Sequence, residues 1–244
     1  MIYVAAAFLV TALLYASVGY GGGSTYNALL ALAGVDYRLL PAIALACNIV
    51  VVTGGTIRFA RAGITPWRDA LLLTAIAAPA AFFGGLTPIG EGAFLTLLGA
   101  SLVLTALTLL IPLRERQGQA TRMARWMPLA AAPIGYLAGL VGIGGGIFLA
   151  PLLHLTRWHH ARAIAGTASV FILVNSLFGL VGQMAKGGTD RLASAVTFGL
   201  PLLLAVAVGG QVGSLLAARL LPPAWIRWLT AALTLWVGVR LLVG

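Results

Sequence analysis

Charge is what this sequence has least of. Asp, Glu, Lys and Arg together make up 8% of the 244 residues, whereas about a quarter of the residues in a soluble domain are charged. Hydrophobic residues make up 61%, so too little polar surface remains to coat a water-soluble fold of this size. These proportions exclude an ordinary soluble enzyme and a disordered chain.

Cysteine and acidic residues are also scarce. The single cysteine, Cys47, makes a disulfide within the chain impossible. The five acidic residues all lie at the boundaries of apolar runs, and none lies inside one. Carboxylates buried in membrane spans are the usual mark of proton relays and cation sites. Their absence disfavours a carboxylate-gated cation pump and favours an anionic or neutral substrate.

Long charge-free runs divide the chain into membrane-spanning segments. A helix that crosses a bilayer needs about 20 apolar residues, and most of the runs fit one helix each. Such continuous runs also exclude a transmembrane β-barrel, whose strands alternate between polar and apolar residues. The sequence therefore predicts an all-α polytopic membrane protein with about eight membrane segments. The runs are 1–35, 39–57, 70–90, 92–113, 126–156, 163–185, 192–218 and 228–239.

Basic residues outnumber acidic ones and give a net charge of +10. In a soluble protein this excess would suggest nucleic-acid binding. In a membrane protein the same excess is typical of cytoplasmic loops. We therefore expect the lipid bilayer, and no nucleic acid, as a partner.

Two of the runs are too long for one helix, and each contains a cluster of glycines. A straight helix through 126–156 would be about 45 Å long, as long as the whole bilayer with its headgroups. Each glycine costs about 1 kcal/mol in a helix interior, so the clusters predict breaks. A short helix should follow each break, at about 24–33 and 147–155. The clusters are Gly19, Gly21, Gly22 and Gly23 in the first run and Gly142, Gly144, Gly145 and Gly146 in the second.

The matching glycine clusters indicate an internal duplication. About 20 residues after each cluster, the tripeptide 42–44 matches 163–165, which sets Asn48 opposite Ser169. Such repeats are common in secondary transporters, where they place two broken helices together near the membrane midplane.

The duplication predicts two homologous four-segment halves. They cover residues 1–113 and 124–244, and a cytoplasmic linker, 114–123, joins them. The first segment of each half is expected to be broken or re-entrant at its glycines.

Two relative orientations of the halves stay open. If each broken segment crosses the membrane once, the halves are parallel, and Lys and Arg divide about ten to five between cytoplasmic and outer loops. If each is a re-entrant hairpin, each half crosses three times, the halves are inverted, and the division is eleven to four. Both alternatives place 58–68 and 112–127 in the cytoplasm.

The glycine breaks are the candidate binding site. A helix N-terminus exposes unpaired N–H groups and carries roughly half a positive charge, and glycine lets an anion approach the backbone closely. The alternative interpretation is close helix packing for the glycines and interhelical hydrogen bonds for the polar side chains. The candidate residues are Gly21, Gly22, Gly23, Ser24, Thr25, Asn27, Asn48, Gly144, Gly145, Gly146, Thr167, Ser169 and Asn175.

No catalytic residue, metal or cofactor is expected. A serine nucleophile needs a histidine base, and no histidine lies in a plain span to serve Ser24. His159 and His160 are adjacent, so on a helix they would point in different directions and form a poor metal site. The sequence also lacks a metalloprotease motif and a phosphate-binding loop for ATP.

The motifs resemble those of the TauE/SafE sulfite exporter family, also called the toluene-sulfonate uptake permease family. The resemblance rests on Gly19 to Ser24, on Gly139 to Gly146 and on Ala163 to Ser169. It implies a secondary transporter in the bacterial cytoplasmic membrane for small sulfur-containing anions such as sulfite, sulfonates or sulfoacetate. We expect alternating access, with one half rocking against the other.

Other functions stay open at this point. One is a passive anion channel, and another is a carrier of organic anions without sulfur. A membrane-embedded enzyme lacks a visible nucleophile and base, and in a structural subunit the glycines would serve packing alone. The coupling ion, H⁺ or Na⁺, and assembly as a homodimer are not decided by the sequence.

Overall fold

The computed structural model describes residues 2–18, 21–110, 126–216 and 223–243. The sequence-predicted linker 114–123 therefore lies outside the described residues. The helices are α1 (Ile2–Val18), α2 (Gly23–Leu32), α3 (Leu40–Arg61), α4 (Trp67–Leu86), α5 (Glu91–Leu110), α6 (Met127–Val141), α7 (Gly146–Leu155), α8 (Ala161–Leu216) and α9 (Pro223–Val243).

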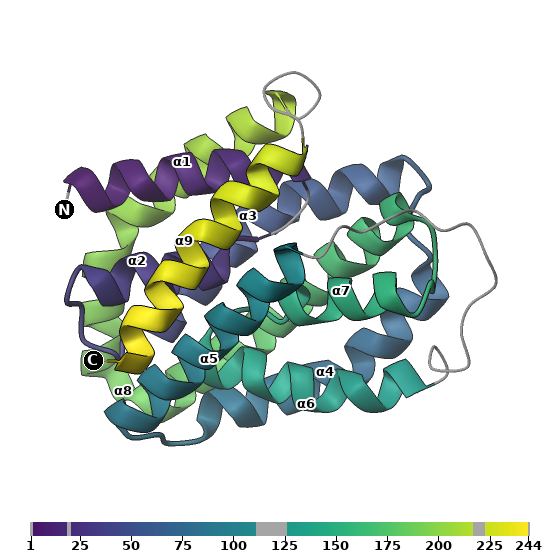
Figure 1. Ribbon diagram of the computed structural model, residues 1–244. Helices are drawn as coiled ribbons and strands as arrows, with labels where there is room; N and C mark the ends of the chain where they lie inside the picture. The colour runs from purple at the N-terminus through teal and green to yellow at the C-terminus, as the bar shows by residue number, and fades with distance from the viewer. Residues whose placement is uncertain (1, 19–20, 111–125, 217–222, 244) are drawn as a thin grey trace.

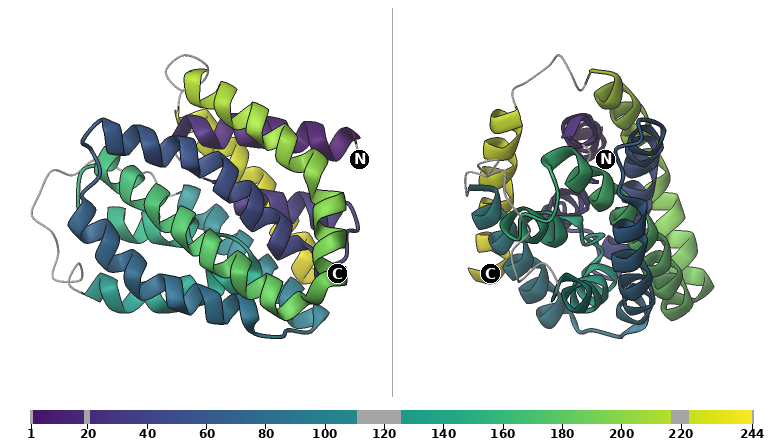
Figure 2. Two further views of the ribbon diagram at one scale, coloured as in Figure 1. Left: turned by 180° about the vertical axis from the view of Figure 1, so that it is seen from behind. Right: turned by 90° about the vertical axis from the view of Figure 1, so that its right-hand side faces the viewer.

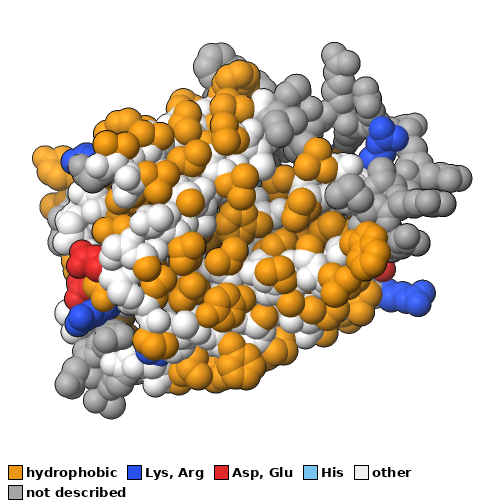
Figure 3. Space-filling view, turned by 60° about the horizontal axis from the view of Figure 1, so that its bottom comes forward, with side chains coloured by type: hydrophobic (Ala, Val, Ile, Leu, Met, Phe, Trp, Pro, Cys, Tyr) orange, Lys and Arg blue, Asp and Glu red, His pale blue; other side chains and the backbone are white. Residues whose placement is uncertain are grey.

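Several of these helices can cross a membrane. Five helical stretches in the described ranges are long and apolar enough, namely α3, α4, α5 and two parts of α8, Ala161–Gly187 and Ala193–Gly213. Hydrophobic side chains cover much of the face seen in Figure 3, and charged side chains gather at its two edges. The predicted helical, polytopic membrane architecture is confirmed, whereas the total of about eight segments stays a prediction.

α8 is one helix where the sequence predicts two. Charged residues from Lys186 to Arg191 separate the apolar runs, yet the helix continues from Ala161 to Leu216. Figure 2 shows that α8 bends sharply, so that its two arms run in different directions. A charged stretch must lie outside the apolar part of a membrane protein. A bend in a helix can place it there as well as a loop between two helices can.

The helices run between two ends of the molecule. The Asp36 end contains the α2–α3 and α4–α5 connections and the bend of α8, and the Asp69 end contains the α3–α4 and α7–α8 connections (Figure 1). At the Asp69 end, His159 contacts the Asp69 carboxylate at 2.9 Å. α1 starts from the Asp36 end and α6 from the Asp69 end, so these two helices run in opposite directions.

Each short helix turns back against the helix before it. α2 runs antiparallel to α1, and α7 runs antiparallel to α6 (Figures 1 and 2). Phe8 of α1 stacks on Tyr26 of α2 with ring centroids 4.7 Å apart. Each pair therefore forms a helical hairpin whose tip, the glycine break, lies inside the molecule.

The short helices form the middle of three layers. The right-hand view of Figure 2 shows α5 and α9 on one side of them and α3, α4 and α8 on the other. α5 and α9 pack mainly against each other. They approach closely where a Cβ built on Gly238 would lie 2.9 Å from the carbonyl oxygen of Gly99.

The largest interfaces join helices from different halves of the chain: α3 with α8, α4 with α8, α4 with α6, α1 with α8, and α5 with α9. Small residues allow this contact. A Cβ on Gly139 of α6 would overlap the Ala81 carbonyl of α4, and a Cβ on Gly209 of α8 would overlap the Leu9 carbonyl of α1. Backbones that approach this closely are typical of helix packing in membranes. The first and second parts of the chain are therefore interleaved.

Candidate functional site

The two glycine breaks set the geometry of the site. Gly22 and Gly145 precede α2 and α7 in the left-handed conformation, each with φ of 80°, which a residue with a Cβ rarely adopts. α2 begins at Gly23 and α7 at Gly146, each one residue before the predicted start. The first N–H groups of each helix have no partner within it, so both confirmed breaks present backbone donors inside the molecule.

Asn48 of α3 lies between the two breaks. A Cβ on Gly21 would lie 2.5 Å from Asn48 Oδ1, and a Cβ on Gly23 would overlap the same amide. On the other side, a Cβ on Gly144 would lie 2.7 Å from Asn48 Nδ2. Asn48 is fully buried, and its Nδ2 donates a hydrogen bond to Ile143 O at 3.2 Å. One side-chain amide therefore contacts both glycine breaks, which the sequence predicts to lie together.

Side-chain amides hold the backbone carbonyls at the end of α6. Asn27 Nδ2 donates to Val141 O at 2.9 Å and to Gly142 O at 3.1 Å. Gln183 Nε2 donates to Gly139 O at 2.9 Å and to Leu140 O at 3.3 Å. Together with Asn48, these amides satisfy five consecutive carbonyls, 139–143, which a helix end would otherwise leave unpaired. We call Asn27, Asn48 and Gln183 the amide clamp.

Several buried polar atoms near the breaks have no hydrogen-bond partner. An unpaired polar group costs free energy in a dry interior, so such atoms often mark a binding site or an ordered water. Asn27 and Asn48 use their Nδ2 atoms in the clamp, but the Oδ1 atom of each is unpartnered. Among the residues of α2, α3 and α8 considered for the site, the unpartnered atoms are Ser24 Oγ, Tyr26 Oη, Asn27 Oδ1, Asn48 Oδ1, Thr167 Oγ1, Asn175 Oδ1, Asn175 Nδ2 and Ser176 Oγ.

The interior around these atoms is polar but uncharged. In the described part of the chain, the buried polar side chains are Ser, Thr, Asn and Gln, and none is an acid, a lysine, an arginine or a histidine. The same ranges contain no group of three His, Cys, Asp or Glu residues that could hold a metal ion. The site can therefore offer helix dipoles, hydroxyl groups and neutral amide donors and acceptors to a ligand.

Ser169 does not occupy the position at the second break that Asn48 occupies at the first. Asn48 packs against Gly23 at the start of α2, whereas the residue against Gly146 at the start of α7 is Ile172. Ser169 instead faces α3, with its Oγ 3.7 Å from a Cβ built on Gly55. The expected pairing of Asn48 with Ser169 is therefore not observed, because Ile172, three residues further along α8, lies at that position.

The remaining predicted residues are all buried but have different neighbours. Gly22 packs against the Tyr26 ring, and Gly145 packs against Phe171 and Ala138. The Thr25 hydroxyl is hydrogen-bonded to the Tyr15 hydroxyl at 2.8 Å. These contacts indicate a packing role for Gly145 and a structural bond for Thr25.

Two residues near the breaks are absent from the predicted set. Ser176 Oγ lies 2.9 Å from the Cβ position of Gly144, and Gln183 belongs to the amide clamp. Both are polar residues inside an apolar run, the same sequence feature that makes Asn175 a candidate. Periodicity alone could not show which of these side chains faces α6.

A polar cavity of about 370 Å³ lies at the Asp36 end. Arg38, Lys186, Gln183 and Leu140 are among its lining residues, so it borders the end of α6 that the clamp holds. Lys186 Nζ donates to Thr87 O at 3.1 Å. The hydrogen bond to the Tyr37 hydroxyl raises the pKa of Arg38 above its ordinary value. Arg38 and Lys186 give the cavity a cationic rim.

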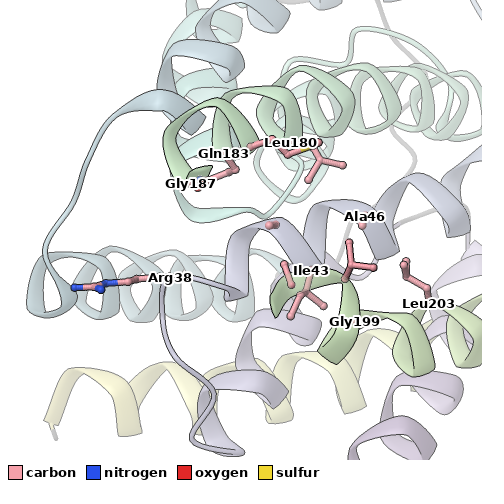
Figure 4. A pocket seen from close by; sticks show the side chains of 12 residues that line it. Arg38, Ile43, Ala46, Leu180, Gln183, Gly187, Gly199 and Leu203 are labelled. Carbon is pink, nitrogen blue, oxygen red and sulfur yellow. The ribbon is translucent and has the colours of Figure 1, made fainter. Parts of the chain in front are cut away.

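A second cavity of about 240 Å³ lies between α3 and the two arms of α8. Figure 4 shows Ile43, Ala46, Leu180, Gly199 and Leu203 around it, with Arg38 at its edge. Its lining is mainly apolar. It offers few donors to an anion, so we do not count it as part of the site.

Comparisons with known proteins agree with this architecture. Residues 3–241 match the sequence model of a family described as Sulfite exporter TauE/SafE. The chain is also similar to the probable membrane transporter protein y4hK of Sinorhizobium fredii. The two are 34% identical over 244 residues, which cover 98% of this chain and 96% of that protein. No solved structure matches the chain.

Proposed function

The chain belongs to the TauE/SafE sulfite exporter family of membrane transporters, and from that premise we propose that it carries small sulfur-containing anions. Sulfite, sulfonates and sulfoacetate-like organosulfonates are the proposed substrates, and the bacterial cytoplasmic membrane is the proposed location. The transport is secondary, since the sequence has no phosphate-binding loop for ATP.

The contact of Asn48 with both glycine breaks is the observation that carries this proposal. It brings helix N-termini, whose dipoles attract anions, together with unpartnered polar atoms in an uncharged interior. Irregular backbone at membrane depth is tolerated where it is buried in protein or lines a cavity. The proposed binding residues are those expected from the sequence around the first break, with Asn48 at the centre.

The helix directions support two inverted halves. Each half would contribute one re-entrant hairpin, α1–α2 or α6–α7, followed by three crossings, which gives eight segments in all. In this arrangement the Asp69 end would face the cytoplasm. The sequence would then place eleven basic residues inside and four outside, as the positive-inside rule requires.

Alternating access is the proposed transport mechanism. Rocking of one half against the other would separate every large interface, because these interfaces join the two halves. α5 and α9 pack mainly against each other and cover the short helices. Movement of this pair disrupts the least packing, so we propose that it opens and closes the central site.

Binding tests this function directly. The purified protein in detergent would be heated with sulfite, thiosulfate, sulfoacetate, methanesulfonate, lactate or chloride. A ligand that binds only the folded state stabilises it by about 2.7 kcal/mol at a hundredfold excess over Kd. Stabilisation by a sulfur oxyanion but not by lactate or chloride, lost in Asn48→Ala, is the expected result.

Flux through the protein separates a carrier from a channel. In proteoliposomes a carrier saturates with substrate and exchanges labelled for unlabelled anion. A flux that rises linearly with concentration, without exchange, would replace the proposal with a passive anion channel.

A further inference from the structure

We infer that the apolar cavity between α3 and the two arms of α8 binds an anionic phospholipid. One acyl chain occupies the cavity, and the phosphate of the headgroup contacts Arg38 at its edge. This lipid site goes beyond the proposed function, because it requires only that the protein lies in a bilayer.

Small residues leave the cavity open. It lies where α8 bends beside the start of α3, so that its walls come from three helical stretches that do not run parallel (Figure 2). The described side chains leave about 240 Å³ unfilled. The lining residues with the smallest side chains, or none, are Ala42, Ala46, Gly187, Ala195 and Gly199.

Hydrocarbon suits this cavity better than water does. A buried water needs about two to four polar partners, and the lining is mainly apolar. Gln183 is a polar residue of the lining, but its Nε2 atom already donates to the carbonyls of α6. An empty cavity would leave its walls without dispersion contacts. An apolar chain supplies these contacts without displacing a hydrogen bond.

The cavity opens on the surface that faces lipid. Both arms of α8 are apolar enough to cross a membrane. Met184 on one arm and Val196 on the other line the cavity, and they are 41% and 53% exposed. An acyl chain can therefore enter between the arms directly from the bilayer. Exposed apolar residues continue the same faces at helical spacing, namely Phe178 and Val181 on the first arm and Leu200 and Leu204 on the second.

Arg38 is placed for the headgroup. It is exposed in the α2–α3 connection at the Asp36 end, and it is the only charged residue among the described residues that line this cavity. Its side chain extends away from Ile43 and Leu203 in Figure 4, as a headgroup extends away from its acyl chains. Asp36 and Glu91 line a different cavity with Arg38. The described residues therefore place a positive charge at this cavity, and a guanidinium group matches a phosphate.

Native mass spectrometry of the purified full chain tests this site, because it counts bound lipids and identifies them by mass. The delipidated protein in detergent would be mixed with dioleoyl phosphatidylglycerol or dioleoyl phosphatidylcholine, which have identical acyl chains. We expect the anionic lipid to bind about fivefold more tightly, the effect of one basic residue near an anionic headgroup. Equal binding of the two lipids would overturn the inference.

Variants of Arg38 test the headgroup contact. Arg38→Gln should bring the two affinities within twofold of each other, whereas Arg38→Lys should keep most of the preference for phosphatidylglycerol. Arg38 is exposed, so neither change disturbs the packing between helices. An unchanged preference in Arg38→Gln would show that the headgroup does not contact this residue and would overturn the inference.

Ala46→Leu tests the cavity itself. A leucine at this position fills space that the acyl chain needs, so phosphatidylglycerol should bind at least tenfold more weakly. The matched control is Ala100→Leu, which adds the same side chain to an exposed position of α5 and should change binding less than twofold. Equal effects of the two variants would mean that the lipid binds elsewhere on the surface and would overturn the inference.

The wild-type comparison and the Arg38 variants decide the question even if Ala46→Leu does not fold. The measured mass also distinguishes other occupants of the cavity. A wild-type protein that retains detergent alone, or that forms a lipid-free dimer in which a second copy covers the cavity, would overturn the inference and leave the proposed function intact.

Discussion

Asn27 on α2 and Gln183 on α8 donate hydrogen bonds to neighbouring carbonyl pairs at the end of α6. Asn27 donates to the carbonyls of Val141 and Gly142, and Gln183 donates to the carbonyls of Gly139 and Leu140. Residues far apart in the chain thus fix the backbone that leads into the second glycine break. The predictions below follow from this clamp, from the close helix contacts and from Asn48.

Loss of a clamp amide should destabilise the protein. Asn27→Leu and Gln183→Leu each leave two buried carbonyls unpaired, and an unsatisfied buried acceptor costs about 1–3 kcal/mol. We expect each variant to unfold at a lower temperature in detergent. The matched control is Thr96→Val, which removes an exposed hydroxyl bonded within its own helix. A control that lowers the unfolding temperature as much as the clamp variants would contradict a special role for the amides.

Glycine should be required for stability at positions where two helices touch, but not at positions with open space around them. Gly139→Ala places a methyl group against the Ala81 carbonyl, and overpacking of this kind costs about 1–3 kcal/mol. Gly92→Ala lies in the first turn of α5 with open space around it. That change should stabilise the helix by up to about 1 kcal/mol. Thermal unfolding of both variants measures the contrast, and a stabilised Gly139→Ala would refute the close α4–α6 contact.

Cysteine labelling should report the direction of the chain in the membrane. Cys47 is buried, and Cys47→Ala gives a background without thiols. Gly90→Cys at the Asp36 end should react with an impermeant maleimide from outside intact cells. Ala62→Cys at the Asp69 end should react only after the cells are opened. The reverse pattern would invert the proposed orientation, and labelling of both from one side would exclude a membrane crossing by α4.

Asn48→Asp should abolish anion binding without removing the side chain's shape. The carboxyl group is nearly isosteric with the amide, but its ionised form repels an oxyanion at short range, and a form neutralised by burial lacks the two amide N–H donors. We expect methanesulfonate to bind at least a hundredfold more weakly, while Thr105→Val, which removes a buried hydroxyl of α5, leaves binding within twofold. Retained binding in Asn48→Asp would remove Asn48 from the site.

The sequence predicts the local features of this fold well because they depend on local physics. Charged residues are costly inside a membrane, so they mark the ends of the spans. Glycine clusters disfavour helix, so they mark both breaks to within one residue. The choice between a single crossing and a hairpin depends on contacts between α1 and α2. The repeat alone does not contain that information.

Positions that depend on contacts across the repeat are harder to predict. The tripeptide match pairs Asn48 with Ser169, yet Ile172 packs where Asn48 would. A three-residue displacement moves a side chain about 4.5 Å along a helix, which is enough to exchange a polar neighbour for an apolar one. The clamp role of Gln183 likewise requires α8 and α6 to be adjacent, and no local pattern specifies this.

The unbroken course of α8 joins the two hairpins. One arm touches the first hairpin, where Gly209 lies against Leu9, and the other holds the second hairpin through Gln183. A displacement of either hairpin tip must therefore either carry an arm of α8 with it or break the contact that this arm makes.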